Sequence, residues 1–230
     1  MEVISHFIDG KKFSKNDSRK GMVFNPATGD QIAEVELGSK ATINLAVESS
    51  AKAFLKWSKT TPITRARIFT KYKELLVKNM DDLAEMVSKQ HGKTIPDAKG
   101  SIQRGIEVVE YVTGITSSLK GEHSSSVGTN VDSHTLRQPL GVCAGITPFN
   151  FPAMVPMWMF PVALACGNTF ILKPSEKDPS CPLRLAELAI EAGLPPGVLN
   201  LVNGDKEAVD GLLENKKVQA VSFVGSTPVA

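Results

Sequence analysis

No charged side chain occurs between Arg137 and Lys173. A stretch this long and apolar must either cross a membrane or form the buried centre of a water-soluble fold. Its most apolar part, residues 151–166, falls short of the about 20 residues that a spanning helix needs, and prolines interrupt it at positions 152, 156 and 161. Each proline removes a backbone donor and bends or stops a helix. We therefore expect a buried core helix and no membrane partner.

The composition argues against a second class of partner. The chain has 26 basic and 24 acidic side chains, and the resulting net charge of +2 gives no reason to expect nucleic acid. The three cysteines, at positions 143, 166 and 181, are odd in number and lie in apolar or helix-start contexts, so we interpret them as reduced thiols. The N-terminus also lacks the layout of a signal or transit peptide. These features predict a cytoplasmic protein.

Short strands and then four helices are predicted in the first half of the chain. Asp9-Gly10 is a hairpin signal within residues 6–13, residues 25–29 form a turn, and residues 31–37 alternate as in a strand. Apolar periodicity predicts helices over residues 41–57 and 63–79, a third that Asp81 and Asp82 cap and Gly92 ends, and a fourth over residues 96–113.

Residues 119–140 differ from what precedes them because they are polar and rich in small side chains. Residues 131–136 have strand propensity, but no helix follows that could cover a strand pair. Exposed strands need a partner for their free edges. We expect an arm used for association.

From residue 141 onward, short apolar strands alternate with helices. The strands are expected at 141–147, 169–172, 198–202 and 220–224, and the helices at 153–165, 181–192 and 206–214. Ser180 and Pro182 mark the start of the middle helix, and Gly193 marks its end. This order predicts an α/β fold, a Rossmann-like doubly wound parallel sheet preceded by the N-terminal helices.

Polar groups follow three of these strands, at the edge where such sheets bind ligands. Lys173 and Glu176 could bind ribose hydroxyls, and the carboxylate would repel a 2′-phosphate, which favours NAD over NADP. Gly225-Ser226 could open a helix whose N–H groups bind a pyrophosphate. The other interpretations are a solvated loop pair, a plain helix cap and, for Asn150, a turn former. No G-x-G-x-x-G motif is present to decide between them.

Several motifs in fixed order resemble the aldehyde dehydrogenase superfamily. They are PFNFP at residues 148–152, GNT…LKPSE at 167–176, GLPPGVLN at 193–200 and FVGST at 223–227. Within the superfamily, RGIE at 104–107 and the segment 148–160 look like the methylmalonate-semialdehyde (malonate-semialdehyde) dehydrogenases. The resemblance covers essentially the whole chain, from residue 25 to its last residue.

The resemblance implies NAD-dependent oxidation of a semialdehyde with loss of carbon dioxide and transfer of the acyl group to coenzyme A, giving propionyl-CoA or acetyl-CoA. It places Thr147 and Phe149 on the nicotinamide side of the cofactor, and Ser226 at the pyrophosphate. The adenosine end would be held by Lys173, Glu176 and Lys177.

Two further roles concern the substrate. The Asn150 amide would form half of an oxyanion hole, where charge develops on the aldehyde oxygen. Arg104, which spacing alone would leave as a surface arginine, would bind the substrate carboxylate.

The sequence departs from the family at the reacting group. In this family a cysteine thiolate attacks the aldehyde and a glutamate is the general base, and none of the three cysteines lies in that motif. We therefore expect N-terminal strands and helices over residues 1–118, an oligomerisation arm over 119–140 and an incomplete Rossmann-like core over 141–230. The catalytic domain would be absent, and this piece alone would not turn over.

Two other functions stay open at this point. The parent enzyme could be a hydrolytic aldehyde dehydrogenase for another aldehyde, or the chain could be a non-catalytic NAD-binding or assembly module. For the parent enzyme we expect a homo-oligomer, either a dimer or a tetramer, and no metal.

Overall fold

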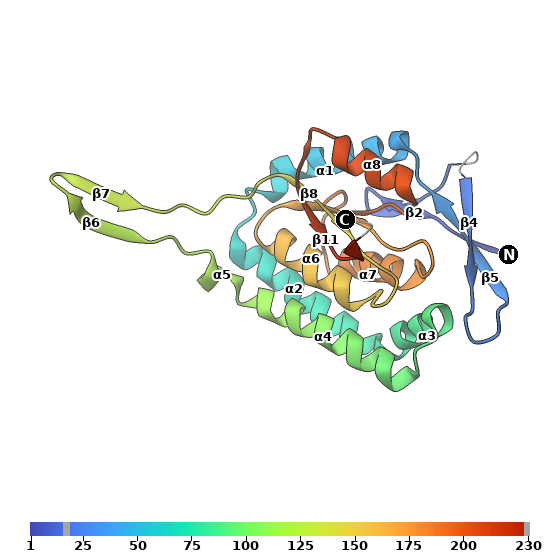
Figure 1. The fold of residues 1–230 in the computed structure, drawn as a ribbon. Coiled ribbons are helices and arrows are strands. Elements are labelled where there is room, and N and C mark those ends of the chain that lie inside the picture. Colours follow the sequence, from blue (N-terminus) through green and yellow to red (C-terminus); the bar gives the residue numbers. More distant parts are fainter. Residues whose placement is uncertain (16–18, 228–230) are drawn as a thin grey trace.

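The computed structural model describes residues 1–15 and 19–227. Its centre is a sheet with strand order β11-β8-β9-β10-β2-β3, in which β11, β8, β9 and β10 run parallel. Their bounds are β8 (Val142–Ile146), β9 (Thr169–Lys173), β10 (Leu199–Leu201) and β11 (Val218–Phe223). The parallel, doubly wound α/β fold predicted from the sequence is thus confirmed (Figure 1).

An antiparallel hairpin from the N-terminus extends this sheet at one edge. It consists of β2 (His6–Ile8) and β3 (Lys11–Phe13), joined at Asp9 and Gly10 with φ of 55° and 75°. Positive φ at both turn residues is the geometry of a type I′ turn, so the hairpin prediction is confirmed. Phe7 pairs with Leu201 of β10, which places the start of the chain beside its last third.

The N-terminal strands also form a small sheet of their own, with order β1-β5-β4. These strands are β1 (Glu2–Ile4), β4 (Arg19–Phe24) and β5 (Gln31–Leu37). The strand predicted at residues 31–37 is confirmed, and residues 25–29 form the predicted turn between β4 and β5.

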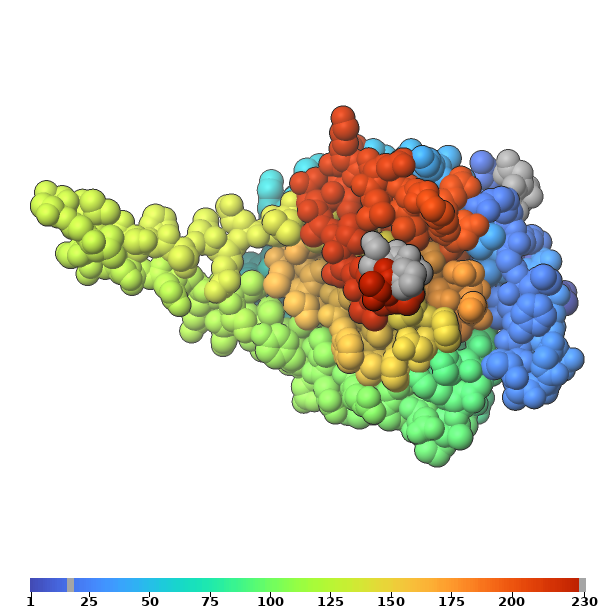
Figure 2. All heavy atoms as spheres, in the orientation of Figure 1, coloured from blue at the N-terminus to red at the C-terminus, as the bar shows by residue number. Residues whose placement is uncertain are grey.

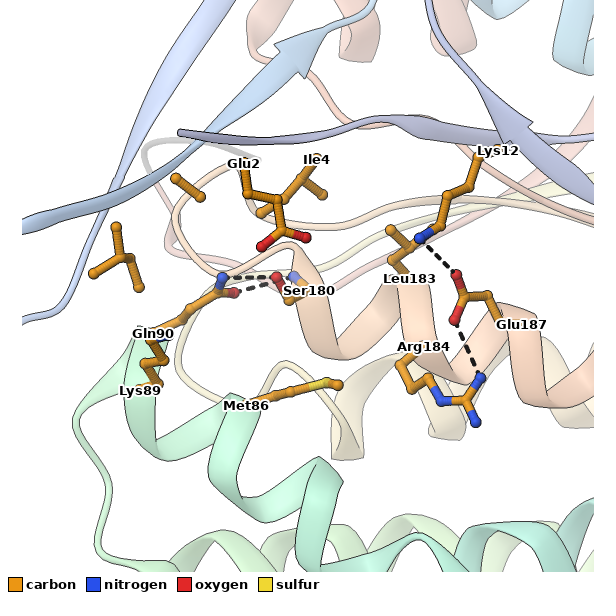
Figure 3. A pocket seen from close by; sticks show the side chains of 12 residues that line it. Glu2, Ile4, Lys12, Met86, Lys89, Gln90, Ser180, Leu183, Arg184 and Glu187 are labelled. Carbon is orange, nitrogen blue, oxygen red and sulfur yellow. Dashed lines mark hydrogen bonds and ion pairs between the residues drawn. The ribbon is translucent and has the colours of Figure 1, made fainter.

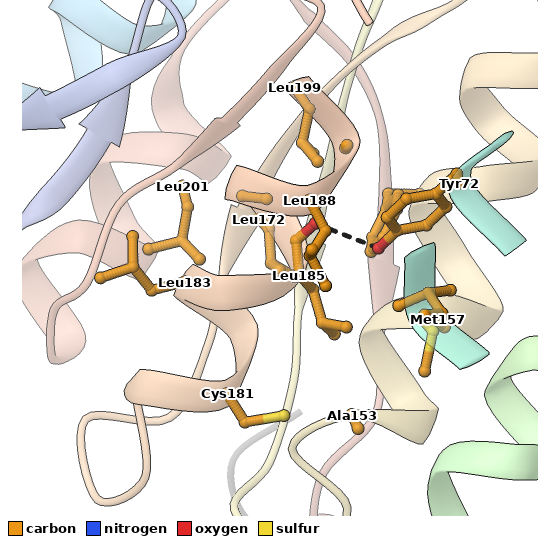
Figure 4. Close-up of a cluster of buried hydrophobic side chains, with 14 of the residues drawn as sticks. Tyr72, Ala153, Met157, Leu172, Cys181, Leu183, Leu185, Leu188, Leu199 and Leu201 are labelled. Atoms are coloured by element: carbon orange, nitrogen blue, oxygen red, sulfur yellow. Dashed lines mark hydrogen bonds between the residues drawn. The ribbon is translucent and has the colours of Figure 1, made fainter. Parts of the chain in front are cut away.

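Helices cover both faces of the central sheet. On one face, α1 (Lys40–Trp57) and α8 (Lys206–Glu214) pack on alternate side chains of β8 and β9, such as Ala144 and Ile171. On the other face, α6 (Met154–Ala165) and α7 (Ser180–Glu191) pack on the intervening ones, including Phe170 and Leu172. Figure 4 shows this second core, where the Tyr72 hydroxyl donates to the Leu185 carbonyl at 3.1 Å.

The outer helices are α2 (Pro62–Lys78), α3 (Met80–His91), α4 (Ile95–Thr113) and the short α5 (Ile115–Ser118). The predicted helices are confirmed to within one residue at each end, whereas α5 was not predicted. Helix α4 presses on α6 at Gly105, where any Cβ would collide with Met157. The apolar stripe expected on α4, which includes Ile102 and Val109, is buried.

Helix α6 is the buried helix that the uncharged stretch predicts. Its C-terminal carbonyls would be left without partners in the core, but side chains from other helices satisfy two of them. Trp57 Nε1 donates to the Leu164 carbonyl at 3.1 Å, and Arg65 Nε donates to the Ala165 carbonyl at 2.8 Å. In the described part of the chain, no helix is long and apolar enough to cross a membrane.

Residues 119–140 project from the body as a two-stranded antiparallel hairpin (Figures 1 and 2). Its strands are β6 (His123–Gly128) and β7 (Val131–His134), and every residue of both is exposed. The two exposed strands predicted here are therefore confirmed. Their use in association stays a prediction.

One predicted helix cap is wrong. Asp81 and Asp82 lie in the first turn of α3, whose N-cap position is Asn79, and no side chain caps that helix. The predicted start of the middle helix is confirmed, because Ser180 is the first residue of α7. Its N–H donates to the side-chain oxygen of Gln90 on α3 at 3.0 Å, a partner too distant in sequence for a local pattern to reveal.

His6 is fully buried beside the equally buried Glu36 and should make stability depend on pH. The Asn203 N–H donates to its Nδ1 at 3.2 Å, which fixes the neutral ring, and burial lowers the pKa of His6 from 6.5 to about 4. Below pH 6.5, His6 binds a proton in the unfolded chain but not in the folded chain. The free energy of unfolding should therefore fall by about 3 kcal/mol as the pH drops toward 4.

Urea denaturation of the parent chain and of His6→Gln between pH 4 and 7 measures this effect. The difference between the two should shrink as pH falls, because the glutamine does not titrate. The exposed His134, changed to Gln, is the control and should leave the profile of the parent unchanged. Parallel curves of the free energy of unfolding against pH for His6→Gln and the parent would contradict the lowered pKa of His6.

Candidate functional site

The three polar segments singled out in the sequence lie together at the carboxyl ends of adjacent strands. Ile146 of β8 pairs with Lys173 of β9 on one side and with Phe223 of β11 on the other. The pairing continues past the strands, because the Thr147 N–H donates to the Lys173 carbonyl and the Val224 N–H to the Ile146 carbonyl, both at 3.1 Å. The sheet register therefore brings these segments to one edge.

Lys173 is buried with its ammonium 3.4 Å from the carboxylate of Glu176, whose side chain is 39% exposed. Burial of the lysine excludes the interpretation of the pair as a solvated loop pair. The loop that follows is fixed at Ser175, whose hydroxyl accepts from the Lys177 N–H at 3.1 Å. Lys173 can thus donate, and Glu176 accept, hydrogen bonds at a position that the loop holds in place.

Thr147 and Phe149 follow β8 and differ in their exposure. Thr147 is buried, and its hydroxyl has no hydrogen-bond partner within the described residues. Phe149 is 48% exposed, and its ring lies between His91, with the ring centroids 6.2 Å apart, and the Lys177 ammonium at 4.7 Å. Lys177, expected at the adenosine end, therefore lies against Phe149, which was expected on the nicotinamide side.

Asn150 is exposed in the loop between β8 and α6. Its carbonyl accepts a hydrogen bond from Lys93 Nζ, in the link between α3 and α4. Arg104 is exposed on α4, and it lies near enough to Lys93 for its charge to lower the pKa of that lysine. The close contact of α4 with α6 at Gly105 lies next to Arg104 in the chain.

Ser226 is exposed just beyond β11. The preceding Gly225 has no room for a side chain, because a Cβ there would collide with the ring of Phe223. The helix expected to open after Ser226 would occupy residues 228–230, which lie outside the described residues.

Sequence reasoning missed a buried acid at this edge. Asp178 is 2% exposed, neither of its carboxylate oxygens accepts a hydrogen bond from the described residues, and burial followed by repulsion from Glu176 raises its pKa to about 8. The charge of Lys93 opposes this rise. In the sequence Asp178 lies between Lys177 and Pro179, which signals neither its burial nor its approach to Lys93, because Lys93 lies on a separate element.

The three cysteines supply no reactive thiolate. Burial raises the pKa of Cys143 within β8, of Cys166 at the end of α6 and of Cys181 in α7. A thiol with a raised pKa stays protonated and is a poor nucleophile. Their interpretation as small buried hydrophobic residues agrees with these positions. Within the described residues, no cluster of His, Cys, Asp and Glu could hold a metal ion.

A separate cavity of about 210 Å³ lies between the N-terminal strands, α3 and α7 (Figure 3). Its charged groups mostly pair with one another, as in the ion pairs of Lys12 with Glu187 at 3.2 Å and of Arg184 with Glu187 at 3.2 Å. At its other end Gln90 Nε2 donates to the Ser180 hydroxyl at 2.7 Å. The Gln90 contact joins α3 to α7 and the Lys12 contact joins β3 to α7, and we assign the cavity no ligand.

The edge formed by β8, β9 and β11 has the features that a dinucleotide requires. A buried hydroxyl without a partner, at Thr147, and a buried ammonium, at Lys173, both stand where a ligand could complete their bonding. Gly225 allows close approach of the backbone. The residues present therefore fit NAD, although the buried thiols cannot attack a carbonyl.

Comparison with known proteins agrees with this geometry. Residues 13–230 match the sequence profile of the aldehyde dehydrogenase family. A malonate-semialdehyde dehydrogenase of Pseudomonas aeruginosa is 53% identical over 230 residues, which make up 100% of this chain and 46% of that protein.

Two solved structures are also similar to this chain. A protein of Sinorhizobium meliloti, provisionally described as a methylmalonate-semialdehyde dehydrogenase and complexed with NAD, has a TM-score of 0.97 at 57% identity. The methylmalonate-semialdehyde dehydrogenase of Oceanimonas doudoroffii has a TM-score of 0.97 at 53% identity. Each match covers 100% of this chain and 47% of the other, so the chain spans about half the length of its relatives.

The buried Asp178 predicts a stability profile opposite to that of His6. An unfolded aspartate loses its proton near its ordinary pKa of 3.8, whereas the folded one keeps it to about 8. The free energy of unfolding should therefore fall as pH rises from 4 to 8. Asp178→Asn mimics the protonated acid, so this variant should gain stability over the parent across that range, on the order of 5 kcal/mol at pH 8.

Urea denaturation at several pH values measures the gain. Asp30→Asn, at an exposed turn, is the matched control and should show no gain that grows with pH. A gain for Asp178→Asn that is the same at pH 4 and pH 8 would refute the raised pKa.

Proposed function

Because the chain belongs to the aldehyde dehydrogenase family, we propose that it is the cofactor-binding part of a longer enzyme that oxidises methylmalonate semialdehyde or malonate semialdehyde with NAD. The parent enzyme would release carbon dioxide and pass the acyl group to coenzyme A, giving propionyl-CoA or acetyl-CoA. Relatives named for these semialdehydes support the substrate class.

The observation that carries the proposal is the pair of the buried Lys173 with the partly exposed Glu176, at the edge where β8, β9 and β11 end together. A lysine with this little exposure and a single carboxylate partner at 3.4 Å is suited to share a ligand with that carboxylate. Ribose hydroxyls can accept from the ammonium and donate to the carboxylate. Glu176 would repel a 2′-phosphate, which favours NAD over NADP.

The remaining residues act around the cofactor and the aldehyde. Bound NAD supplies the acceptor for a hydride. Thr147 and Phe149 line its groove, and Ser226 with the backbone after β11 binds the pyrophosphate. The resemblance gives the adenosine end to Lys177, whose ammonium lies 4.7 Å from the centre of the Phe149 ring. Asn150 donates its side-chain amide to the aldehyde oxygen as negative charge develops there.

Arg104 is the residue we assign to the substrate's carboxylate. A guanidinium can hold a carboxylate through two parallel hydrogen bonds, which orients a semialdehyde as well as binding it. Its exposure on α4 leaves those donors accessible. Coenzyme A as the acyl acceptor rests on the resemblance alone.

We also propose which residues form each domain, how the parent enzyme assembles and in which compartment it works. Residues 1–118 and 141–230 would form the cofactor-binding domain, and residues 119–140 would be an arm through which the parent enzyme forms a dimer or tetramer. The fully exposed strands of the arm support this role, because free edges favour pairing. Unpaired, buried or half-buried cysteines support a reducing, cytoplasmic environment.

One alternative has an observation in its favour. The raised pKa values of the cysteines favour a chain that binds NAD without turning over. A hydrolytic parent enzyme is the other alternative, and a requirement for coenzyme A in product release would separate it from the acylating one.

The first prediction concerns cofactor choice. Glu176→Gln should raise the Kd for NAD by about 10-fold, which is about 1.4 kcal/mol, because a charged acceptor for the ribose is lost. The Kd for NADP should rise less or fall, since the repulsion is also lost. Titration calorimetry on the 230-residue chain measures both, with the exposed Glu74→Gln as control. An unchanged ratio of the two constants would argue against the role of Glu176.

The second prediction concerns turnover. The purified 230-residue chain should form no NADH from semialdehyde, NAD and coenzyme A, because all of its cysteine thiols are protonated at neutral pH. Absorbance of NADH measures this, and a purified relative of full length is the positive control. NADH formation by the chain alone would overturn the assignment.

A further inference from the structure

Lys93 lies in a rigid link between two helices. Gly92 ends α3 in the left-handed region, with φ of 86°, and its N–H donates to the Ser88 carbonyl at 2.8 Å. Thr94 begins α4 as its N-cap, and its hydroxyl also bonds to the Asp97 carboxylate at 3.0 Å. Because both neighbours are fixed, the backbone of Lys93 has little freedom.

From this link the side chain of Lys93 reaches two consecutive residues of the loop between β8 and α6. Its ammonium donates to the Asn150 carbonyl and lies 3.6 Å from the centre of the Phe151 ring. A cation over an aromatic face is attracted by the ring, so one ammonium holds the carbonyl of one residue and the side chain of the next.

The loop has few other constraints at this point. Pro148 and Pro152 lack an N–H, so neither can donate a backbone hydrogen bond. Main-chain bonds anchor the loop at Thr147, whose N–H donates to the Lys173 carbonyl, and at Phe151, whose carbonyl accepts from the Val155 N–H. Between these two anchors, Lys93 is the donor among the described residues that bonds to the Asn150 carbonyl.

The contact with Lys93 leaves the side-chain amide of Asn150 available to a ligand. Lys93 occupies the backbone carbonyl, whereas the side-chain amide makes no hydrogen bond to the described residues and is exposed. A loop held through its main chain can present a free side chain in a fixed direction. The charge of Asp97 favours the cation of Lys93, as that of Asp178 does once this acid has lost its proton, whereas the charge of Arg104 opposes it.

We propose that Lys93 is a positioning residue that holds the Asn150 loop so that the amide faces the developing oxyanion. The proposal rests on the function proposed above for Asn150. Lys93 does not itself contact substrate. An oxyanion donor must be in place before charge develops, so a loose loop would cost rate rather than binding.

The 230-residue chain itself provides the first test, which needs no catalysis. In the ¹⁵N–¹H spectrum, the side-chain amide of Asn150 is assigned by its disappearance in Asn150→Asp. In Lys93→Met, which keeps the apolar stem, this signal should shift and broaden as the loop samples several conformations. Lys93→Arg, which keeps a donor and a cation, should restore most of the parent's signal.

Matched controls separate positioning from folding. Lys89→Met removes an exposed lysine of α3, one turn earlier, and should leave the Asn150 signal unchanged. The midpoint of thermal unfolding should stay close to that of the parent in all variants. The Kd for NAD should stay within about 2-fold of the parent's, because the residues assigned to the adenosine end lie at the end of β9 and just after it. An unchanged Asn150 signal in Lys93→Met, or equal changes in Lys89→Met, would overturn the proposal.

Kinetics of the full-length enzyme that carries this chain provide the second test. Lys93→Met should lower kcat by about 10- to 100-fold with the KM for NAD nearly unchanged, and Lys93→Arg should recover most of it. A rise in KM with kcat unchanged would overturn the positioning role. If the full-length parent itself oxidises no semialdehyde, the proposed function fails, whereas the spectrum of the chain still decides whether Lys93 holds Asn150.

Discussion

The burial of α6 is the constraint on which the rest of the structure depends. An uncharged helix can be stable in a protein only between other apolar surfaces, and here the sheet lies on one side and α2 and α4 on the other. Its last carbonyls find donors in Trp57 and Arg65, and the absence of a side chain at Gly105 lets α4 approach. The position of α6 in turn determines where the loop before it, with Asn150, can lie.

The candidate site depends equally on register. Because β8 pairs with β9 and β11 up to their last residues, groups that are far apart in sequence end at one edge. Because helices cover both faces of the sheet, a ligand can reach this edge only at the ends of the strands. There Lys173 and Thr147 are buried without a full set of hydrogen-bond partners. Unsatisfied polarity is costly in a core, and at a binding edge it is available to a ligand.

The sequence was sufficient for the features that depend on local patterns. Apolar periodicity located the long helices, Asp9-Gly10 located a hairpin, and motif order identified the family. Features that depend on contacts between distant residues were missed. Gln90 on α3 accepts from the first N–H of α7, at Ser180, and Lys93 reaches Asn150 from another element. Local propensity contains no information about either pair, because each forms only after the helices have packed.

The place of the N-terminal hairpin has a consequence for how the chain is made. Phe7 pairs with Leu201, and the Asp9 N–H donates to the side chain of the fully buried Asn200 at 2.8 Å. During synthesis, β2 must therefore wait for most of the described residues to follow it before it can pair with β10. Loop closure over such a separation is slow and leaves strand edges unpaired in the meantime. The hairpin of β2 and β3 would thus reach its final position only late, after β10 has been made.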